Sequence, residues 1–196
     1  MPTPALPPEF RPRPSLPVLR TERLTLRAVT SADLDAVYGY LSREEVCRYL
    51  LHEPLSREET ERKLVLAEKS TALRADGDTA RLAVVHDDEV VGEVQLTLVS
   101  AATATVEIGW IFSPHVAGRG FATEAARVLL DHAFETLNAH RIIAHLHPDN
   151  TGSSRLCERL GMRHEALHRS DLWVKNGWED TSIYAILRQD WAAPQR

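Results

Sequence analysis

One glycine-containing segment decides the fold of this chain: Ser113-Pro114-His115-Val116-Ala117-Gly118-Arg119-Gly120-Phe121-Ala122-Thr123-Glu124. It lies between a strand-like run and a long helical pattern. Glycine lets the backbone approach a ligand closely, and the first amides of a helix have no intrahelical acceptor. The helix dipole also favours negative charge at this end. The segment therefore predicts either a site for a pyrophosphate or a plain tight turn.

The sequence on both sides of this segment predicts a mixed α/β fold. Upstream, the runs 81–86, 90–100 and 105–112 alternate like strands and form an antiparallel meander. Downstream, apolar residues at helical spacing from Ala122 to Leu137 predict a helix, and 141–147 predicts a strand. A connection of this length permits a parallel pair, so we expect strands 105–112 and 141–147 to be neighbours.

The two ends of the chain add further elements. A strand is predicted at 23–29, followed by a helix capped by Thr30 or Ser31. A capping-box pattern beginning at Ser56 predicts a second helix that runs to about residue 74. Near the other end, a short helix at 153–160 precedes two strands, which are joined by a tight turn at Asn176-Gly177.

Length and composition limit the class of protein. The 196 residues suggest one domain, which we place at 18–196, after a proline-rich segment at 1–17 that we expect to be an extended, flexible arm. A net charge of -5 at pH 7 offers no broad cationic surface, so nucleic acid is not an expected partner. Two cysteines make no disulfide framework, and no apolar run is long enough to cross a bilayer. We expect a cytoplasmic protein with no membrane partner.

The central segment resembles the cofactor loop of the GNAT acetyltransferases, which reads Gln or Arg, any two residues, Gly, any residue, then Gly or Ala, and opens a helix. Gly120 and Ala122 match this pattern, whereas Ala117 stands where the family usually has Gln or Arg. The resemblance implies a central, mostly antiparallel seven-stranded sheet with a splayed parallel pair and flanking helices. It also implies that acetyl-CoA binds through its pyrophosphate to the loop residues Ala117, Gly118, Arg119, Gly120, Phe121, Ala122 and Thr123.

A second resemblance lies downstream and points to the ribosomal-protein (RimJ/RimL-like) branch of this family. Many GNAT proteins have Asn, then Tyr seven residues later, then Gly-Phe; here Asn150 and Gly161 match, but Cys157 replaces the Tyr. The branch lacks that Tyr and carries a serine three residues after the Asn, which is Ser153 here. The resemblance implies that Asn150 binds the pantetheine arm and that Ser153 acts as the acid at the leaving sulfur. It also makes a homodimer an expected state.

The implied reaction is direct acetyl transfer from acetyl-CoA to a primary amine, either a protein N-terminus or a small amine. A backbone amide at Ile111 or Phe112 would polarise the acetyl carbonyl. Glu107 is the candidate base; its alternative is a cross-strand ion pair, and Glu93 has the same two interpretations. A CoA-binding sensor without turnover is the alternative from another functional class.

Three further groups of residues have competing interpretations. The spacing of His145 and His147 would suit a metal, but no third ligand accompanies them, so we expect no metal. Cys157 is expected to be a small buried hydrophobe rather than a nucleophile, because no His and acid partner can be identified. Four aromatic residues either line the acceptor pocket or belong to the core: Trp110, Trp173, Trp178 and Tyr184.

Overall fold

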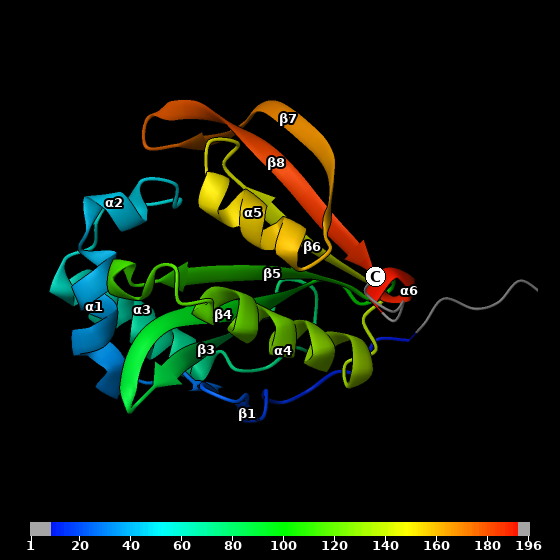
Figure 1. Cartoon of the computed structure of the whole chain (residues 1–196), viewed down its shortest axis with the longest axis horizontal. Coiled ribbons are helices and arrows are strands. Elements are labelled where there is room, and N and C mark those ends of the chain that lie inside the picture. Colours follow the sequence, from blue (N-terminus) through cyan, green and yellow to red (C-terminus); the bar gives the residue numbers. More distant parts are fainter. Residues whose placement is uncertain (1–8, 192–196) are drawn as a thin grey trace, which may run out of the picture.

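The computed structural model describes residues 9–191, and one twisted sheet runs through this part of the chain (Figure 1). Its eight strands are β1 Leu19–Arg20, β2 Thr25–Ala28, β3 Thr79–His86, β4 Glu89–Ser100, β5 Thr105–Phe112, β6 Arg141–Leu146, β7 Arg163–Val174 and β8 Gly177–Leu187. Their order is β1-β2-β3-β4-β5-β6-β8-β7, and β5–β6 is the parallel pair. The predicted count of seven is one too low, because the two residues of β1 form a short edge pair with β2.

The parallel pair opens partway along its length. β5 and β6 pair from Thr105↔Arg141 to Glu107↔Ile143, and no pairing continues beyond this point in the described chain. Both strands go on, because β5 stays paired with β4 as far as Phe112 and β6 stays paired with β8 as far as Leu146. Each strand is therefore held by its outer neighbour while the inner edges diverge, which confirms the predicted splay.

Helices cover the two faces of the sheet (Figure 1). On one face lie α4 Phe121–Glu135 and α5 Thr151–Arg159, which pack into the larger apolar core. On the other face α1 Leu34–Leu41 and α3 Arg57–Lys69 form a smaller cluster around Val37, Tyr40 and Leu64. Because side chains alternate between the two faces of β3, this strand contributes to both cores. Leu82 and Val84 pack in the larger core and Ala83 packs in the smaller cluster. The remaining helical turns are η1 Ser31–Asp33, α2 Glu44–Cys47, η2 Pro114–Val116 and α6 Arg188–Trp191.

Helix ends and turns follow their local chemistry. The predicted capping box is confirmed, because Ser56 accepts a hydrogen bond from the amide of Glu59. The helix ends at Lys69 rather than near residue 74, since Leu73 is extended and pairs with Arg13. The turn of the last hairpin lies one residue earlier than predicted. Its left-handed residues are Lys175 and Asn176, with φ of 49° and 60°, and the following glycine already opens β8.

The described part of the predicted flexible arm packs against the domain. Phe10 and Leu16 are buried, with 4% and 7% of their surface exposed. The amide of Arg11 donates to the carbonyl of Leu137 at 2.8 Å, and Arg13 exchanges backbone hydrogen bonds with Leu73. Residues 9–17 are therefore docked, because two apolar side chains find core positions between the prolines. Residues 1–8 of the predicted arm lie outside the described residues.

Within residues 9–191, none of the helices combines the length and the apolar character needed to cross a membrane.

Candidate active site

The glycine segment forms a turn rich in unused amide donors. Gly118 and Gly120 are left-handed, with φ of 77° and 81°, and α4 begins at the next residue. The amides of Ala117 and Arg119 are used inside the turn, by the carbonyls of Pro114 and Val116. Within the described chain, five of the amides of residues 117–124 have no acceptor, those of Gly118, Gly120, Phe121, Ala122 and Thr123. Such a row of donors at a helix N-terminus suits a pyrophosphate.

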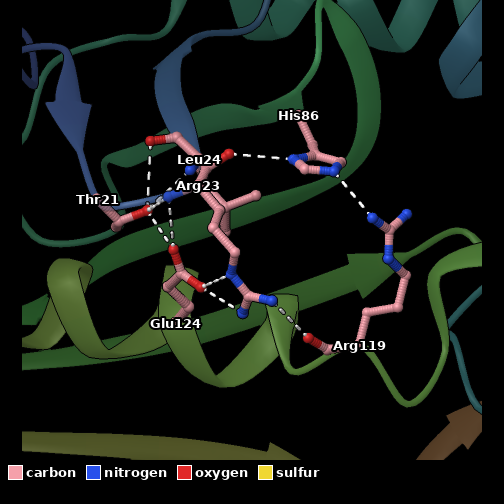
Figure 2. A network of polar contacts seen from close by, with 6 residues as sticks. All are labelled: Thr21, Arg23, Leu24, His86, Arg119 and Glu124. Carbon is pink, nitrogen blue, oxygen red and sulfur yellow. Dashed lines mark hydrogen bonds and ion pairs between the residues drawn. The ribbon is translucent and has the colours of Figure 1, made fainter.

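A network of polar contacts links this turn to residues 21–24 and to His86 (Figure 2). Arg23 donates through Nε to Glu124 at 2.8 Å and through NH1 to the carbonyl of Arg119 at 3.1 Å. Thr21 donates to the same Glu124 carboxylate. Arg119 in turn donates to Nε2 of His86 at 2.9 Å, so this imidazole carries its proton on Nδ1, which donates to the carbonyl of Arg23. Residues 21–24 and His86, both distant from the loop in sequence, thereby hold it in one conformation.

The side chains of Phe121 and Arg119 both take part in the contacts that support the loop. Phe121 is buried, with 1% of its surface exposed, and the guanidinium groups of Arg23 and Arg119 lie 4.8 Å and 4.5 Å from the centre of its ring. The ring of His86 packs against it as well, at 4.4 Å between centroids. Of Phe121, only the amide is therefore left for a ligand. The side chain of Arg119 also faces His86, so any part it takes in binding requires that contact to be given up.

A cavity of about 680 Å³ lies at the point where β5 and β6 diverge. Alternation along β5 directs Glu107, Gly109 and Ile111 to the face that carries α1 and α3. Trp110 points to the opposite face, where it meets α5. The cavity touches side chains of both sets, so it passes through the sheet at the splay. Its other residues from this region are Glu93, Gln95, His145, His147, Asn150 and Ser153.

Ser153 and Asn150 stand together at the α5 side of this cavity. The side-chain oxygen of Asn150 caps α5 by accepting from the amide of Ser153 at 3.1 Å. The hydroxyl of Ser153 accepts from Nε1 of Trp110 at 3.1 Å, which leaves its own proton available for donation. The two residues that sequence resemblance selected are thus adjacent to each other and to the cavity.

Strand geometry distinguishes the two amides proposed to polarise the acetyl carbonyl. The amide of Ser113 donates to the carbonyl of Val91 on β4 at 2.9 Å. Amides alternate in direction along an antiparallel strand, so the amide of Ile111 also points to β4. The amide of Phe112 then points to the opposite edge, where the splay leaves no partner strand. Phe112 is therefore the better candidate of the two.

Glu107 lies in the cavity and in a cross-strand pair at once. Its Oε2 is 3.2 Å from Nδ1 of His145 on β6. The hydrogen bond to Glu107 raises the pKa of His145, and partial burial lowers it. The first effect is larger, so the pKa of His145 lies above its ordinary value. His147 is engaged separately, with Nε2 at 2.8 Å from Glu179 and its ring beside that of Tyr49. Each imidazole thus has its own carboxylate, and the described residues contain no cluster of three or more metal-binding side chains.

Glu93 has surroundings of a different kind. It is buried, with 3% of its surface exposed, and Oε1 lies 3.0 Å from Nζ of Lys63 and 3.5 Å from Arg81. Of its two interpretations the ion pair is the one that this arrangement fits, because two cations hold the carboxylate in place.

The aromatic residues and Cys157 take three different environments. Tyr184 is buried, and Trp110 lines the cavity. Trp173 and Trp178 are exposed, at 59% and 61%, and stack edge to face with centroids 5.4 Å apart. Neither interpretation therefore holds for all four. Cys157 is fully buried, as predicted, and this burial raises the pKa of its thiol to about 12.

Sequence reasoning missed that carboxylates of the last hairpin, together with Glu107, form an acidic wall of the cavity. Asp171, Glu179 and Asp180 line it near the hairpin turn. Lys175 in that turn links the hairpin to the end of α2, since its Nζ donates to the carbonyl of Cys47 at 2.6 Å. The only available sequence signal was the acidic residues on both sides of Asn176-Gly177. Whether their side chains face the cavity depends on how the hairpin twists over the sheet.

The loop, the splay and the cavity together define a transferase that takes a phosphorylated cosubstrate into a gap in its sheet. A family model described as "Acetyltransferase (GNAT) domain" matches residues 23–163. The chain belongs to this family and is an acetyl-CoA-dependent N-acetyltransferase. Its residues fit that cosubstrate, with free amides for the phosphates and a cavity through the sheet for the thioester.

Relatives match along most of the chain. The uncharacterized N-acetyltransferase YnaD of Bacillus subtilis is 34% identical over 176 residues, covering 88% of this chain and 98% of that protein. The spermidine N(1)-acetyltransferase of Vibrio cholerae is 27% identical, covering 85% of this chain and 94% of that protein. A GNAT-family acetyltransferase structure from Bacillus anthracis superposes with a TM-score of 0.79 at 30% identity, covering 88% of this chain and 99% of that one.

Proposed function

We propose that this enzyme acetylates a primary amine of a small molecule that carries at least one further positive charge, as diamines and polyamines do. The observation that carries this proposal is the acidic wall of the cavity on the side away from the phosphate loop. Carboxylates from three strands contribute to it, Glu107 of β5, Asp171 of β7, and Glu179 and Asp180 of β8.

Cations compensate the charges of this wall only in part: Arg48 and Lys175 also line the cavity, and Nζ of Lys175 donates to the backbone carbonyls of Cys47 and Arg48. Glu107, Glu179 and Asp171 are paired with imidazoles, the last with His168 at 3.4 Å. Asp180 accepts from the amide of Ser170. A neutral imidazole leaves its carboxylate partner with a full negative charge, so the wall attracts cations. Lys63 and Arg81 on the opposite side share the carboxylate of Glu93, which limits their repulsion of a cationic substrate.

Each residue has a defined part in this scheme. The free amides of Gly118 and of 120–123 would hold the pyrophosphate, and Asn150 would bind the pantetheine arm. The amide of Phe112 would polarise the acetyl carbonyl, with Ile111 beside it lining the acceptor side. Ser153 would protonate the leaving sulfur, and Glu107 belongs to the group that deprotonates the amine. Transfer is direct, because Cys157 is buried and its thiol pKa is far too high for a nucleophile.

A protein N-terminus is the second candidate acceptor, and the RimJ/RimL-like pattern at Ser153 and Cys157 supports it. The observation in its favour is the exposed pair Trp173 and Trp178 on the hairpin that forms the acidic wall. Such a pair could bind the apolar side chains of a peptide. The spermidine-specific relative instead supports a small amine. Homodimerisation and a cytoplasmic location stay predictions of the sequence.

The acceptor class can be tested by thiol release from acetyl-CoA. We expect 1,5-diaminopentane and spermidine to exceed 1-aminopentane in kcat/KM by about tenfold, the equivalent of about 1.4 kcal/mol from one extra charge. Equal rates for the monoamine and the diamine would remove the charge argument. Preference for N-terminal peptides would establish the second candidate, and acetyl-CoA binding without turnover on any amine would favour the sensor alternative.

A pair of variants connects that result to the wall. Glu179→Gln removes one wall carboxylate and should raise KM for the diamine several-fold with little change for the monoamine. Glu165→Gln is the matched control on the same hairpin, because Glu165 pairs with Arg141 and does not line the cavity. A KM that responds equally to both substitutions would contradict the assignment.

A further inference from the structure

An imidazole–carboxylate pair stands at the root of the splay. Pairing between β5 and β6 ends at Glu107↔Ile143, and His145 is the next residue of β6 on the same face. Nδ1 of His145 is 3.2 Å from Oε2 of Glu107, and both side chains line the cavity. They are partly exposed, at 40% and 29%, so the pair is open to the cavity.

This arrangement fixes how the imidazole can act. With Nδ1 directed at a carboxylate, the neutral ring carries its proton there and keeps the lone pair on Nε2. No contact of Nε2 of His145 with another polar group is found among residues 9–191. His147 differs, because its Nε2 is taken by Glu179 and its Nδ1 by the amide of Asp149. Of the two histidines, His145 is the one with a free basic nitrogen.

An imidazole is also better suited to this proton than a carboxylate. A primary ammonium has a pKa of about 10.4, and a free glutamate of about 4.3 is a weak acceptor for its proton. Histidine, at about 6.5, is closer to neutral pH, and general bases work best when their pKa is near the operating pH. The hydrogen bond that Nδ1 of His145 donates to Glu107 raises the pKa of His145 further in that direction, although partial burial offsets part of this effect.

We propose that His145 is the catalytic base of this enzyme and that Glu107 is a positioning residue that orients it. This inference rests on the proposed function. A proton leaves the ammonium for Nε2 of His145, and the freed lone pair attacks the acetyl carbonyl carbon. The carbon–sulfur bond then breaks with its electron pair on sulfur, which takes a proton from Ser153, and Ser153 regains the second proton that the nitrogen sheds. His145 finally returns its proton to water.

The pH dependence follows from the groups around the ring. Glu107 on β5 and Asp171 on β7 both raise the pKa of His145, while partial burial lowers it; Glu179 of β8 faces the neighbouring His147. Because the base form exists only above this raised pKa, kcat/KM should fall as the pH falls through it. Glu107→Gln removes the largest raising influence, so its acid limb should move to lower pH.

The decisive experiment measures kcat/KM of His145→Gln, Glu107→Gln and His164→Gln from diamine saturation curves over about pH 6 to 9. His164→Gln is the matched control, since His164 stacks on Tyr184 and does not line the cavity. We expect His145→Gln to lower kcat/KM about 100-fold and to lose the acid limb. Glu107→Gln should retain more activity with a shifted limb, and the control should match the wild type.

Two results would overturn the inference. One is a His145→Gln variant within about threefold of the wild type; the other is loss of all activity in Glu107→Gln alone, which would make Glu107 itself the base. Acetyl-CoA calorimetry on each variant separates a folding defect from a catalytic one. Histidine NMR of the wild type gives an independent check, since the His145 signal must titrate at higher pH than in Glu107→Gln. Failure of the wild type on every amine would refute the proposed function instead.

Discussion

Replacing Gly118 by alanine tests whether the loop amides bind the cosubstrate. Gly118 has a φ of 77°, and a Cβ built on it meets no heavy atom within 4 Å. The substitution therefore adds no clash to the protein, and its cost is that of a left-handed backbone, about 1–2 kcal/mol for an L-residue. In the free protein the loop can relax, and binding must restore the left-handed form. The dissociation constant for CoA should rise about 5- to 30-fold.

The assay is calorimetric titration with CoA, and Gly77→Ala is the control. Gly77 has a φ of 92° and equally open surroundings, but its amide donates to the carbonyl of Leu98, whereas the amide of Gly118 has no acceptor among the described residues. It should show the same backbone strain as a loss of thermal stability, with CoA affinity unchanged in the folded protein. If the dissociation constant of Gly118→Ala for CoA stays within about twofold of the wild-type value, the change is smaller than the backbone strain requires. The loop is then a plain turn.

Three further predictions follow from the site. Ser153→Ala should lower kcat about tenfold, a modest loss because a thiolate leaves readily, with CoA affinity unchanged; an unaltered kcat would remove the serine as the acid. Although burial opposes it, hydrogen bonds from Thr21 and Arg23 hold the pKa of Glu124 below its ordinary value, so its stabilising effect is present above about pH 4.3 and lost as the pH falls. Glu124→Gln should therefore flatten acid unfolding followed by circular dichroism, and an unchanged profile would contradict this. With its thiol pKa at about 12, Cys157 should resist iodoacetamide in the native protein, and rapid labelling would show that it is accessible.

Local chemistry explains which features the sequence could predict. The Ser56 capping box and the strand alternation around Glu107 each depend on residues close in sequence, and each is confirmed. The hairpin turn was placed one residue late, because Asn-Gly usually supplies both left-handed positions and here Lys175 takes the first.

Apart from the parallel pair of strands, the features that depend on contacts distant in sequence were not predicted. The brace of Arg23 on Glu124 joins residues 101 apart, and the docking of Phe10 depends on a core assembled from the rest of the chain. The acidic wall depends on the path of a hairpin over the splay. His145 was interpreted as an ordinary strand histidine, because sequence spacing does not reveal that the strand next to it ends its pairing two residues earlier.

The most direct test of the account is the binding of a conjugate in which the sulfur of CoA is joined through an acetyl bridge to a nitrogen of spermidine. The phosphates of the CoA half would bind the loop amides, which do not line the cavity, and the spermidine half would bind the acidic wall inside it. Calorimetry should therefore show weaker binding of the conjugate to both Gly118→Ala and Glu179→Gln than to the wild type. A conjugate whose affinity responds to Gly118→Ala but not to Glu179→Gln would mean that the amine does not bind at the acidic wall.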